Sequence, residues 1–461
     1  MMAKSISRRR VLQTLGLAAG ASALHLKASS RADQAATELP VYRPERLVTA
    51  ITLGAGARGN VYGNYALNHS DQLRIVGVAE PIPIRNERYA HKHQIPAENR
   101  FVTWEHVFQR ARFADAILIT TPDHLHYGPC LKALEMGYDI LLEKPMAQTE
   151  RECRDILAKI QKTKRVVGLC HVLRYAPYFI TLRKLIRDGS IGKLVSLQHF
   201  EPIQHVHMAH SFVRGNWHNS CKSNPIILAK SCHDLDILRW LTDKPCKSLS
   251  AFGDLSWFTK KNAPQGSTAR CIEGCAVESS CPYSALRIYL RERSYLYVFD
   301  LPERTELVPD AIANYLRTTD YGRCVYRMDN DQCDHYTMNL EFEGGITATF
   351  NMEAFTSYHG RRTRVMGSMG DLVGDMEKLV HTDFRTGKQT SYDAANFDEG
   401  VYAKHGHGGG DYRLMANWVE AVARQDASLL SSTIEASIES HLMCFAAERS
   451  RKSRKTVAVR L

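Results

Sequence analysis

Short apolar runs alternate with polar, helix-like stretches through the first third of the chain. The runs read as buried strands of a parallel sheet, over 47–53, 73–79, 114–120, 140–142 and 166–171. Stretches between them, such as 60–68 and 150–163, have the pattern of helices. Repeated strand–helix units predict a doubly wound parallel sheet, that is, a Rossmann domain.

A different pattern follows in the second half. The segment 193–200 alternates apolar and polar residues, and 336–342, 346–355 and 363–367 also read as strands. Long polar or glycine-rich connections separate them, and helical patterns occupy 179–188, 412–424 and 433–449. This half therefore predicts a second α/β domain.

A glycine-rich turn joins the first predicted strand to the first helix. Gly54, Gly56 and Gly59 form a G-x-G-x-x-G pattern, and Glu80 ends the next strand. The glycines allow a tight turn, a close approach to pyrophosphate and close helix–strand packing, and free N–H groups at the helix N-terminus bind phosphate. The pattern predicts a dinucleotide site. Glu80 favours NAD because it would bind the ribose hydroxyls, whereas Arg58 could meet a 2′-phosphate, so NADP stays open.

Polar residues follow two further strands at what should be the same edge of the sheet. They are Thr121, Pro122, His124 and His126 after one strand, and Glu143, Lys144 and Pro145 after the next. Ligands bind at the carboxyl ends of parallel strands, so we expect the first group beside the nicotinamide ribose. A lysine held in that position can donate a proton or polarise a substrate oxygen.

Together these motifs resemble, in order and spacing, the Gfo/Idh/MocA oxidoreductases. The resemblance implies a Rossmann domain at 45–170 and a substrate-binding and oligomerisation domain at 171–461, built on a large, open-faced, mostly antiparallel sheet. It implies hydride transfer between a nicotinamide and a sugar or cyclitol carbon. The predicted cofactor-binding residues are Gly54, Gly56, Arg58, Gly59, Glu80, Thr121, Pro122, His124, His126, Glu143, Lys144 and Arg174.

The resemblance also places a catalytic histidine in the second domain, at His233. The family usually has an aspartate four residues before this histidine, where this chain has Ala229, and an acid three residues after it, here Asp236. Lys144 and His233 are the two candidates for handling the hydroxyl proton, because the pKa of each type can be set near neutrality. Lys230 either replaces the missing polar group or pairs with a carboxylate.

Histidine and aromatic residues predict a substrate-binding wall. His205, His207 and His210 have a spacing that could also ligate a metal, but contacts with sugar hydroxyls explain them equally well. The indole of Trp217 suits the apolar face of a sugar. The predicted substrate-binding residues are His210, Arg214, Trp217, Lys230, Asp236 and His407.

Cysteines gather in an insertion at 260–335. Cys271, Cys275, Cys281 and Cys324 are candidate ligands of a structural zinc. Their spacing is not that of a standard zinc motif, and disulfides or free thiols remain alternatives.

The N-terminus has the pattern of an export signal. Residues 1–31 carry a twin arginine at Arg8–Arg9, an apolar run and small residues typical of cleavage, which resembles a Tat signal peptide. We therefore expect a periplasmic protein, with a linker at 32–44 and no membrane anchor after signal cleavage. The formal net charge is +11, and six of these positive charges lie in residues 1–31. The net charge of the remaining chain is small and does not imply nucleic-acid binding.

Three functional hypotheses remain. The first is an exported NAD(P)-dependent oxidoreductase that acts on a sugar, glycoside or polyol and retains its cofactor. The second is an NAD-dependent glycoside hydrolase working by oxidation, elimination, hydration and reduction. The third is a non-catalytic protein that keeps NAD structurally. We also expect a homodimer or homotetramer, because an uncovered sheet face favours burial.

Overall fold

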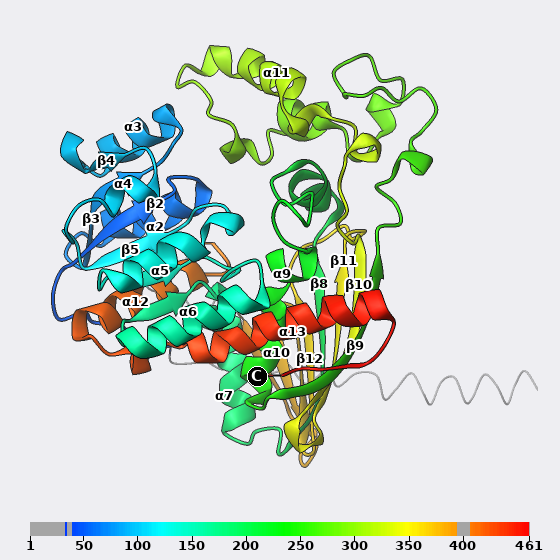
Figure 1. Cartoon of the computed structure of the whole chain (residues 1–461). Coiled ribbons are helices and arrows are strands. Elements are labelled where there is room, and N and C mark those ends of the chain that lie inside the picture. The colour runs from blue at the N-terminus through cyan, green and yellow to red at the C-terminus, as the bar shows by residue number, and fades with distance from the viewer. Residues whose placement is uncertain (1–32, 35–38, 394–405, 461) are drawn as a thin grey trace, which may run out of the picture.

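The computed structural model describes residues 33–34, 39–393 and 406–460. The predicted export signal lies outside the described residues, as does part of the predicted linker. Two sheets organise the described chain: a parallel sheet of the N-terminal half and a larger sheet of the C-terminal half (Figure 1). No helix among the described residues has both the length and the apolar character needed to cross a bilayer.

The N-terminal sheet confirms the predicted Rossmann fold. Its six strands are all parallel, in the order β4-β3-β2-β5-β6-β7. The strands are β2 (Val48–Leu53), β3 (Leu73–Ala79), β4 (Arg100–Phe101), β5 (Ala116–Ile119), β6 (Asp139–Leu142) and β7 (Val167–Leu169). The connecting helices are α2 (Ala57–Asn68), α3 (Pro83–Lys92), α4 (Trp104–Val107), α5 (Tyr127–Glu135) and α6 (Glu150–Thr163).

A C-terminal helix completes the core of this first sheet. Helix α12 (Gly410–Arg424) lies against the sheet on the side of α2, and its Trp418 is fully buried. The Trp418 indole donates a hydrogen bond to the carbonyl of Ile140 at 2.9 Å. Gly168 leaves room for the ring, because a Cβ there would lie 3.0 Å from the indole. The chain therefore returns to the cofactor-binding half after building the second sheet.

The second sheet is large and mostly antiparallel, as predicted. Its order is β1-β15-β14-β13-β12-β8-β11-β10-β9-β16, with parallel pairing at β8–β11 and β1–β15. The strands are β1 (Asp33–Gln34), β8 (Leu194–Pro202), β9 (Cys246–Asp254), β10 (His335–Phe342), β11 (Thr347–Glu353), β12 (Arg362–Gly367), β13 (Gly370–Gly374), β14 (Lys378–Asp383), β15 (Gln389–Asp393) and β16 (Val457–Ala458).

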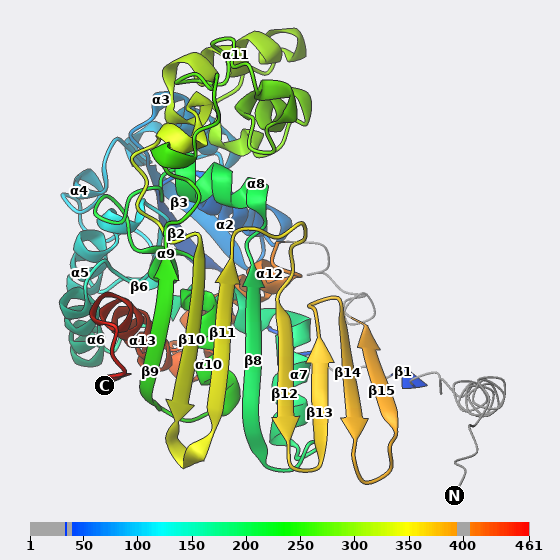
Figure 2. The same cartoon turned by 90° about the vertical axis from the view of Figure 1, so that its right-hand side faces the viewer.

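Helices cover one face of the second sheet and leave the other open (Figure 2). The covering helices are α7 (Pro177–Arg187), α10 (Cys232–Thr242) and α13 (Ile434–Ser453). Alternation along the strands explains the difference between faces, since Leu340 and Ala348 are buried whereas Asn339 and Thr347 are exposed. Shorter helices α8 (His205–His207) and α9 (Ile226–Ala229) lie at the end of the sheet nearest the Rossmann domain.

The predicted insertion lies between β9 and β10 and has little regular structure. Apart from α11 (Val308–Thr318), it consists of short helical turns, and it forms the top of the molecule in Figure 1. Its own hydrophobic core contains seven buried residues. The insertion reaches the Rossmann domain through an ion pair between Arg85 of α3 and Asp300, at 2.7 Å.

Candidate active site

The glycine loop has the geometry that a dinucleotide requires. Gly54 has a φ of +93°, and a Cβ there would lie 2.7 Å from the carbonyl oxygen of Thr120. A Cβ at Gly59 would lie 2.2 Å from the carbonyl oxygen of Gly54, so both positions need glycine. Gly56 is different, because a Cβ there would meet nothing within 4 Å. Helix α2 begins at this open position without a side-chain cap, so its N–H groups can receive a phosphate.

Glu80 lies at the carboxyl end of β3, as the motif predicts. Its carboxylate accepts hydrogen bonds from the backbone N–H of Ala55, at 2.8 Å, and of Ile82, at 3.0 Å. These bonds tie the acid to the glycine loop and fix its orientation. The placement is suited to binding ribose hydroxyls beside the loop.

Arg58 bonds to protein carboxylates. Its guanidinium donates to Glu143 at 2.6 Å and to Asp411 of α12 at 2.7 Å. Tyr62 also donates to Glu143, at 2.6 Å. Burial by itself would raise the pKa of both acids, but the charge of Arg58 acts together with other neighbouring charges and hydrogen bonds, and the pKa of each acid is lowered. In this arrangement Arg58 neutralises two buried anions, which leaves it little capacity for the predicted phosphate contact.

The residues after β5 line the same edge of the sheet. Pro122 and His124 are exposed, and Thr121 is half-buried and donates to the carbonyl of Leu125 at 3.0 Å. His126 is buried, and its two ring nitrogens contact the carbonyls of Pro145, at 2.7 Å, and Thr121, at 2.9 Å. His126 therefore links the loops that follow β5 and β6, and Thr121, Pro122 and His124 remain accessible to a cofactor.

Lys144 projects from the end of β6 toward the second domain. Its ammonium donates a hydrogen bond to the carbonyl of Ala229 at 2.6 Å and lies 6.0 Å from the ring centre of Trp217. Its backbone N–H donates to Glu143 at 3.0 Å. A backbone carbonyl thus meets the lysine at the position where the resembled family usually has an aspartate.

His233 begins α10 and faces the region of Lys144. It is 5% exposed, and its Nδ1 has no partner among the described residues. Burial lowers the pKa of His233 well below its ordinary value, and the charge of Lys144 adds to the effect. The ring lies 5.8 Å from that of His171 and 6.0 Å from that of His407. His233 is therefore a neutral imidazole with a free nitrogen, close enough to Lys144 to respond to its charge.

Lys230 pairs with an acid, one of the two alternatives expected for it. Its ammonium lies 3.1 Å from Glu201, which also contacts Arg361 at 2.9 Å. Arg361 in turn contacts Asp234 at 2.6 Å. The charge of Arg361 also acts on His233, so this network of alternating charges lies near the imidazole.

Asp236 and Arg174, assigned above to substrate and cofactor, bond to each other. The guanidinium donates two hydrogen bonds to the carboxylate, at 2.7 and 2.6 Å. His171 lies 3.5 Å from the same carboxylate. All three side chains are buried, so they contact one another in the protein interior and stabilise the site indirectly.

Trp217 and His407 lie close to the proposed reaction centre. The indole of Trp217 donates to Asp123, at the end of β5, at 3.2 Å. His407 lies 3.2 Å from Asp411, the acid that Arg58 also binds. These contacts join the two halves of the molecule around Lys144.

His210 and Arg214 lie within the insertion interface. His210 is 2% exposed, accepts or donates a hydrogen bond with Tyr289 at 2.8 Å, and stacks on Tyr295 and Tyr321. Burial lowers the pKa of His210 to about 3. Arg214 is also 2% exposed and bonds to the carbonyls of Arg323 and Tyr283. Both side chains are therefore occupied by protein contacts and are not exposed to solvent.

The four candidate zinc ligands line one small cavity in the insertion, together with Arg214. As the side chains are placed, no three Cys, His, Asp or Glu residues of the described chain stand close enough to hold an ion, so the expected zinc site is not supported. All twelve cysteines are free thiols.

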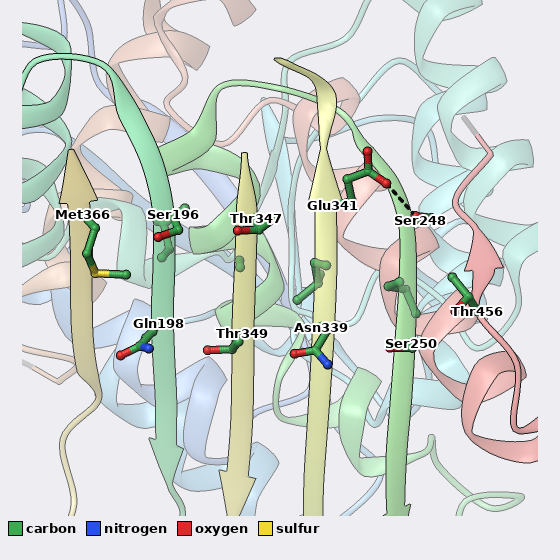
Figure 3. Close-up of a pocket in the computed structure, with 14 residues that line it drawn as sticks. Ser196, Gln198, Ser248, Ser250, Asn339, Glu341, Thr347, Thr349, Met366 and Thr456 are labelled. Carbon is green, nitrogen blue, oxygen red and sulfur yellow. Dashed lines mark hydrogen bonds between the residues drawn. The ribbon is translucent and has the colours of Figure 1, made fainter. Parts of the chain in front are cut away.

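A hollow lies away from these residues, on the open face of the second sheet. It measures about 590 Å³ and is lined by polar side chains such as Gln198, Ser250, Asn339 and Thr349 (Figure 3). Rows of hydroxyl and amide groups project from neighbouring strands into it. No titratable pair suited to proton transfer lines it, so its chemistry is that of a binding surface.

Several site residues were not identified from the sequence. Asp123, His171, Glu201, Arg361 and Asp411 all contribute buried charges or ring contacts around Lys144 and His233. Asp123 lies within the strand-end motif. Glu201 and Arg361 come from strands whose side-chain directions the sequence does not reveal.

Replacing Arg58 with methionine should destabilise the protein, because Glu143 and Asp411 would keep buried charges without a cationic partner. We expect a loss of about 3–5 kcal/mol in the free energy of unfolding at pH 7. Arg58 lowers the pKa of both acids, so its contribution is full above their unfolded pKa values and declines as the pH falls. The difference between variant and parent should therefore shrink on acidification. Urea unfolding at pH 7.5 and at pH 3.5, which lies below the unfolded pKa values of both acids, measures it.

The matched control is Arg385→Met, which removes an exposed arginine paired with Asp383 at 2.9 Å. An exposed pair contributes about 0–1 kcal/mol, so this variant should unfold like the parent. Equal destabilisation of both variants would contradict the role assigned to Arg58.

Known proteins resemble this chain in sequence. The putative oxidoreductase YteT of Bacillus subtilis is 23% identical over 324 residues, which cover 65% of this chain and 71% of YteT. The scyllo-inositol 2-dehydrogenase (NAD(+)) of Bacillus subtilis is 26% identical over 211 residues, covering 45% of this chain and 58% of that protein.

Solved structures share the fold. Levoglucosan dehydrogenase in complex with NADH and levoglucosan superposes with a TM-score of 0.66 at 15% identity, covering 90% of this chain and all of that chain. An oxidoreductase from Agrobacterium radiobacter, in complex with NAD+, L-tartaric acid and magnesium, gives a TM-score of 0.65 at 13% identity, with 89% and 98% covered.

Two family models account for most of the chain. Residues 49–171 match the NAD-binding Rossmann fold of an oxidoreductase family, and residues 183–459 match the C-terminal alpha/beta domain of the same family. The match agrees with the two-domain fold, a parallel Rossmann sheet followed by a large, mostly antiparallel sheet. The chain belongs to the Gfo/Idh/MocA family of NAD-binding oxidoreductases.

Proposed function

We propose that this protein oxidises a secondary hydroxyl of a sugar, glycoside or polyol, with Lys144 and His233 handling the proton. The observation that carries the proposal is the approach of a Rossmann-domain amine and a neutral, unpartnered imidazole beside an open glycine loop. Bound NAD+ would accept the hydride. Gly54, Gly56, Gly59, Glu80 and the N-terminus of α2 would hold the cofactor.

The two catalytic side chains have different tasks. His233 is neutral because burial and the charge of Lys144 lower its pKa, so its imidazole can accept the hydroxyl proton. The Lys144 ammonium would exchange its bond to Ala229 for one to the substrate oxygen and stabilise negative charge that develops there. Trp217 closes the site between the two halves by its bond to Asp123 and provides an apolar surface for a sugar ring.

The chemistry of the surrounding residues supports a polyhydroxy substrate. Lys230, Glu201 and Arg361 offer donors and acceptors that are already fixed by their own ion pairs. Levoglucosan dehydrogenase and the inositol dehydrogenases, which share the fold or sequence similarity, are named for substrates of this kind. NAD is favoured over NADP because Glu80 would repel a 2′-phosphate while Arg58 is occupied by Glu143 and Asp411.

We also propose export to the periplasm through the Tat pathway, supported by the twin arginine and apolar run of residues 1–31. A protein exported after folding can carry its cofactor with it. Stoichiometric NAD in the purified protein would support this, and a protein that binds no nicotinamide nucleotide at all would refute the oxidoreductase assignment.

Lys144→Ala and His233→Asn should each lower kcat by about 10²–10⁴-fold, because each removes a group that transfers or stabilises the proton. Cofactor binding should be retained, which protein-bound NAD fluorescence can measure. In the parent, the oxidation rate should fall only well below pH 6.5, since the lowered pKa keeps His233 neutral in mildly acidic solution.

Lys132→Ala is the control, because Lys132 is an exposed lysine of the same domain, on α5. Full turnover by Lys144→Ala would contradict these roles. So would an oxidation rate of the parent that already falls near the ordinary imidazole pKa.

A glycoside hydrolase of the oxidation–elimination–hydration–reduction type would use the same lysine and histidine. The two reactions differ in their products, so aryl glycosides without added NAD distinguish them. Without an added hydride acceptor, an oxidoreductase should form at most one ketosugar per bound NAD+, with the aglycone still attached and the cofactor left as NADH. Catalytic release of the aglycone would instead establish hydrolysis.

We further propose that two copies associate through the open face of the second sheet. The hollow in Figure 3 and exposed side chains of the same sheet, such as Val195 and Phe252, would be buried there. Thr349→Glu places like charges in this surface and should convert the oligomer to monomers, measured by light scattering. Thr386→Glu, in the exposed turn after β14, should leave the mass unchanged, and an unaltered Thr349→Glu oligomer would refute this interface.

A further inference from the structure

One segment of the insertion, residues 295–301, contacts both domains. At its start, the ring of Tyr295 stacks on that of His210, which follows α8 in the second domain, with ring centres 4.3 Å apart. At its end, the carboxylate of Asp300 accepts a hydrogen bond from Arg85 of the Rossmann domain at 2.7 Å. In both views of the molecule the insertion lies at the same end as α3 (Figures 1 and 2). We call residues 295–301 the bridging segment.

The bridging segment reaches the Rossmann domain beside the expected cofactor site. Arg85 belongs to α3, as does Arg88, which donates a hydrogen bond to the carbonyl of Leu301 at 3.0 Å. Burial by itself would lower the pKa of Arg85, but its bond to Asp300 and the charges of Asp300 and Glu80 act in the opposite direction, and the pKa is raised. Arg85 therefore lies close enough to Glu80 to respond to the acid that we expect to bind the adenosine ribose.

Contacts within the insertion give the bridging segment a fixed shape. Its Phe299 is 5% exposed and stacks on Tyr315 of α11, with ring centres 4.8 Å apart. The hydroxyl of Tyr315 also accepts a hydrogen bond from the backbone N–H of Asp300 at 3.2 Å. Tyr295 has a φ of +57°, which is an outlier for a bulky residue. Such a conformation persists only where the surrounding structure imposes it.

The two domains therefore touch at both ends of the expected dinucleotide site. At the nicotinamide end, Lys144 donates a hydrogen bond to the carbonyl of Ala229 at 2.6 Å. At the adenosine end, next to Glu80, Arg85 pairs with Asp300 at 2.7 Å. A dinucleotide bound between these contacts needs at least one of them to open before it dissociates, as a substrate does beneath a closed loop.

We propose that Asp300 and Arg85 retain bound NAD by fastening the insertion across the adenosine end of the site. This inference rests on the proposed function, because it requires a cofactor that stays bound between turnovers. When the ion pair opens, the bridging segment can move away from α3 while Tyr295 still contacts the second domain. Both side chains are half-buried, so the pair can open without unfolding the core. The pair thus controls the rate of cofactor release and takes no part in proton transfer.

The rate at which NADH leaves the full chain tests the proposal, measured as the loss of protein-bound NADH fluorescence during a chase with excess NAD+. Asp300→Ala should release NADH about 2–5-fold faster than the parent, the size of effect that a partly exposed ion pair allows. The control is Glu292→Ala, which removes an ion pair of the same length, 2.7 Å, made with Arg287 within the insertion. This control should release NADH at the parental rate.

Parental release by Asp300→Ala, from a protein that binds NAD, would overturn this inference and leave the oxidoreductase assignment intact. A parent that binds no nicotinamide nucleotide would instead refute both.

Two further variants separate this role from a general loss of stability. In an Arg85→Gln background, Asp300→Ala should have no additional effect, because both changes remove the same contact. An undiminished effect in that background would show that Asp300 does not act through Arg85. Tyr295→Gly removes the ring at the other end of the bridging segment, and glycine accepts the positive φ without strain. It should also speed release, and a parental rate would overturn the proposal even if Asp300→Ala does not fold.

Discussion

The ion pairs of Arg58 connect the three parts of the chain that form the active site. Arg58 begins the helix of the glycine loop, Glu143 precedes Lys144 at the end of β6, and Asp411 begins α12 in the C-terminal region. Burying two carboxylates is unfavourable unless a cation compensates them, so this arginine determines whether the three segments can meet. The same contact directs Glu143 toward the backbone of Lys144 and Asp411 toward His407.

In the second domain, arginines also pair with buried carboxylates around the site. Arg361 pairs with Glu201 and Asp234, and Arg174 pairs with Asp236. These bonds hold α10 in place against the sheet and leave His233 as the neutral group among charged neighbours. Its lowered pKa is therefore a consequence of the framework around it, chiefly burial and then the charge of Lys144. A neutral imidazole beside an ammonium is a suitable arrangement for taking a proton from an alcohol.

The insertion packs against both domains. It covers His210 with Tyr295 and Tyr321 and contacts the Rossmann domain through Asp300 and Arg85. Few of its residues are buried, so its rigidity has to come from specific links as much as from packing. The stacked rings and the ion pair with Arg85 are the links that the structure offers.

The sequence by itself determined the fold class, the glycine loop, Glu80 and the position of Lys144 at a strand end. These features depend on local patterns: apolar runs bounded by turns, glycines at set spacing, and a strand followed by proline. The strands β13 and β14 were not identified, because they are short and expose much of their length. The open antiparallel sheet came from family resemblance, since pairing partners are not visible in a local pattern.

Only the tertiary structure decided which charged residues face the ligand and which face each other. Arg58, Arg174 and Asp236 were assigned to cofactor or substrate, whereas the structure pairs them with buried partners 62 to 353 residues away. Such partners meet only when the two sheets are assembled, and the cost of burying a charge then selects the pairs. For the same reason Arg214 lies beside the cysteines, a contact that no local pattern in the sequence could indicate.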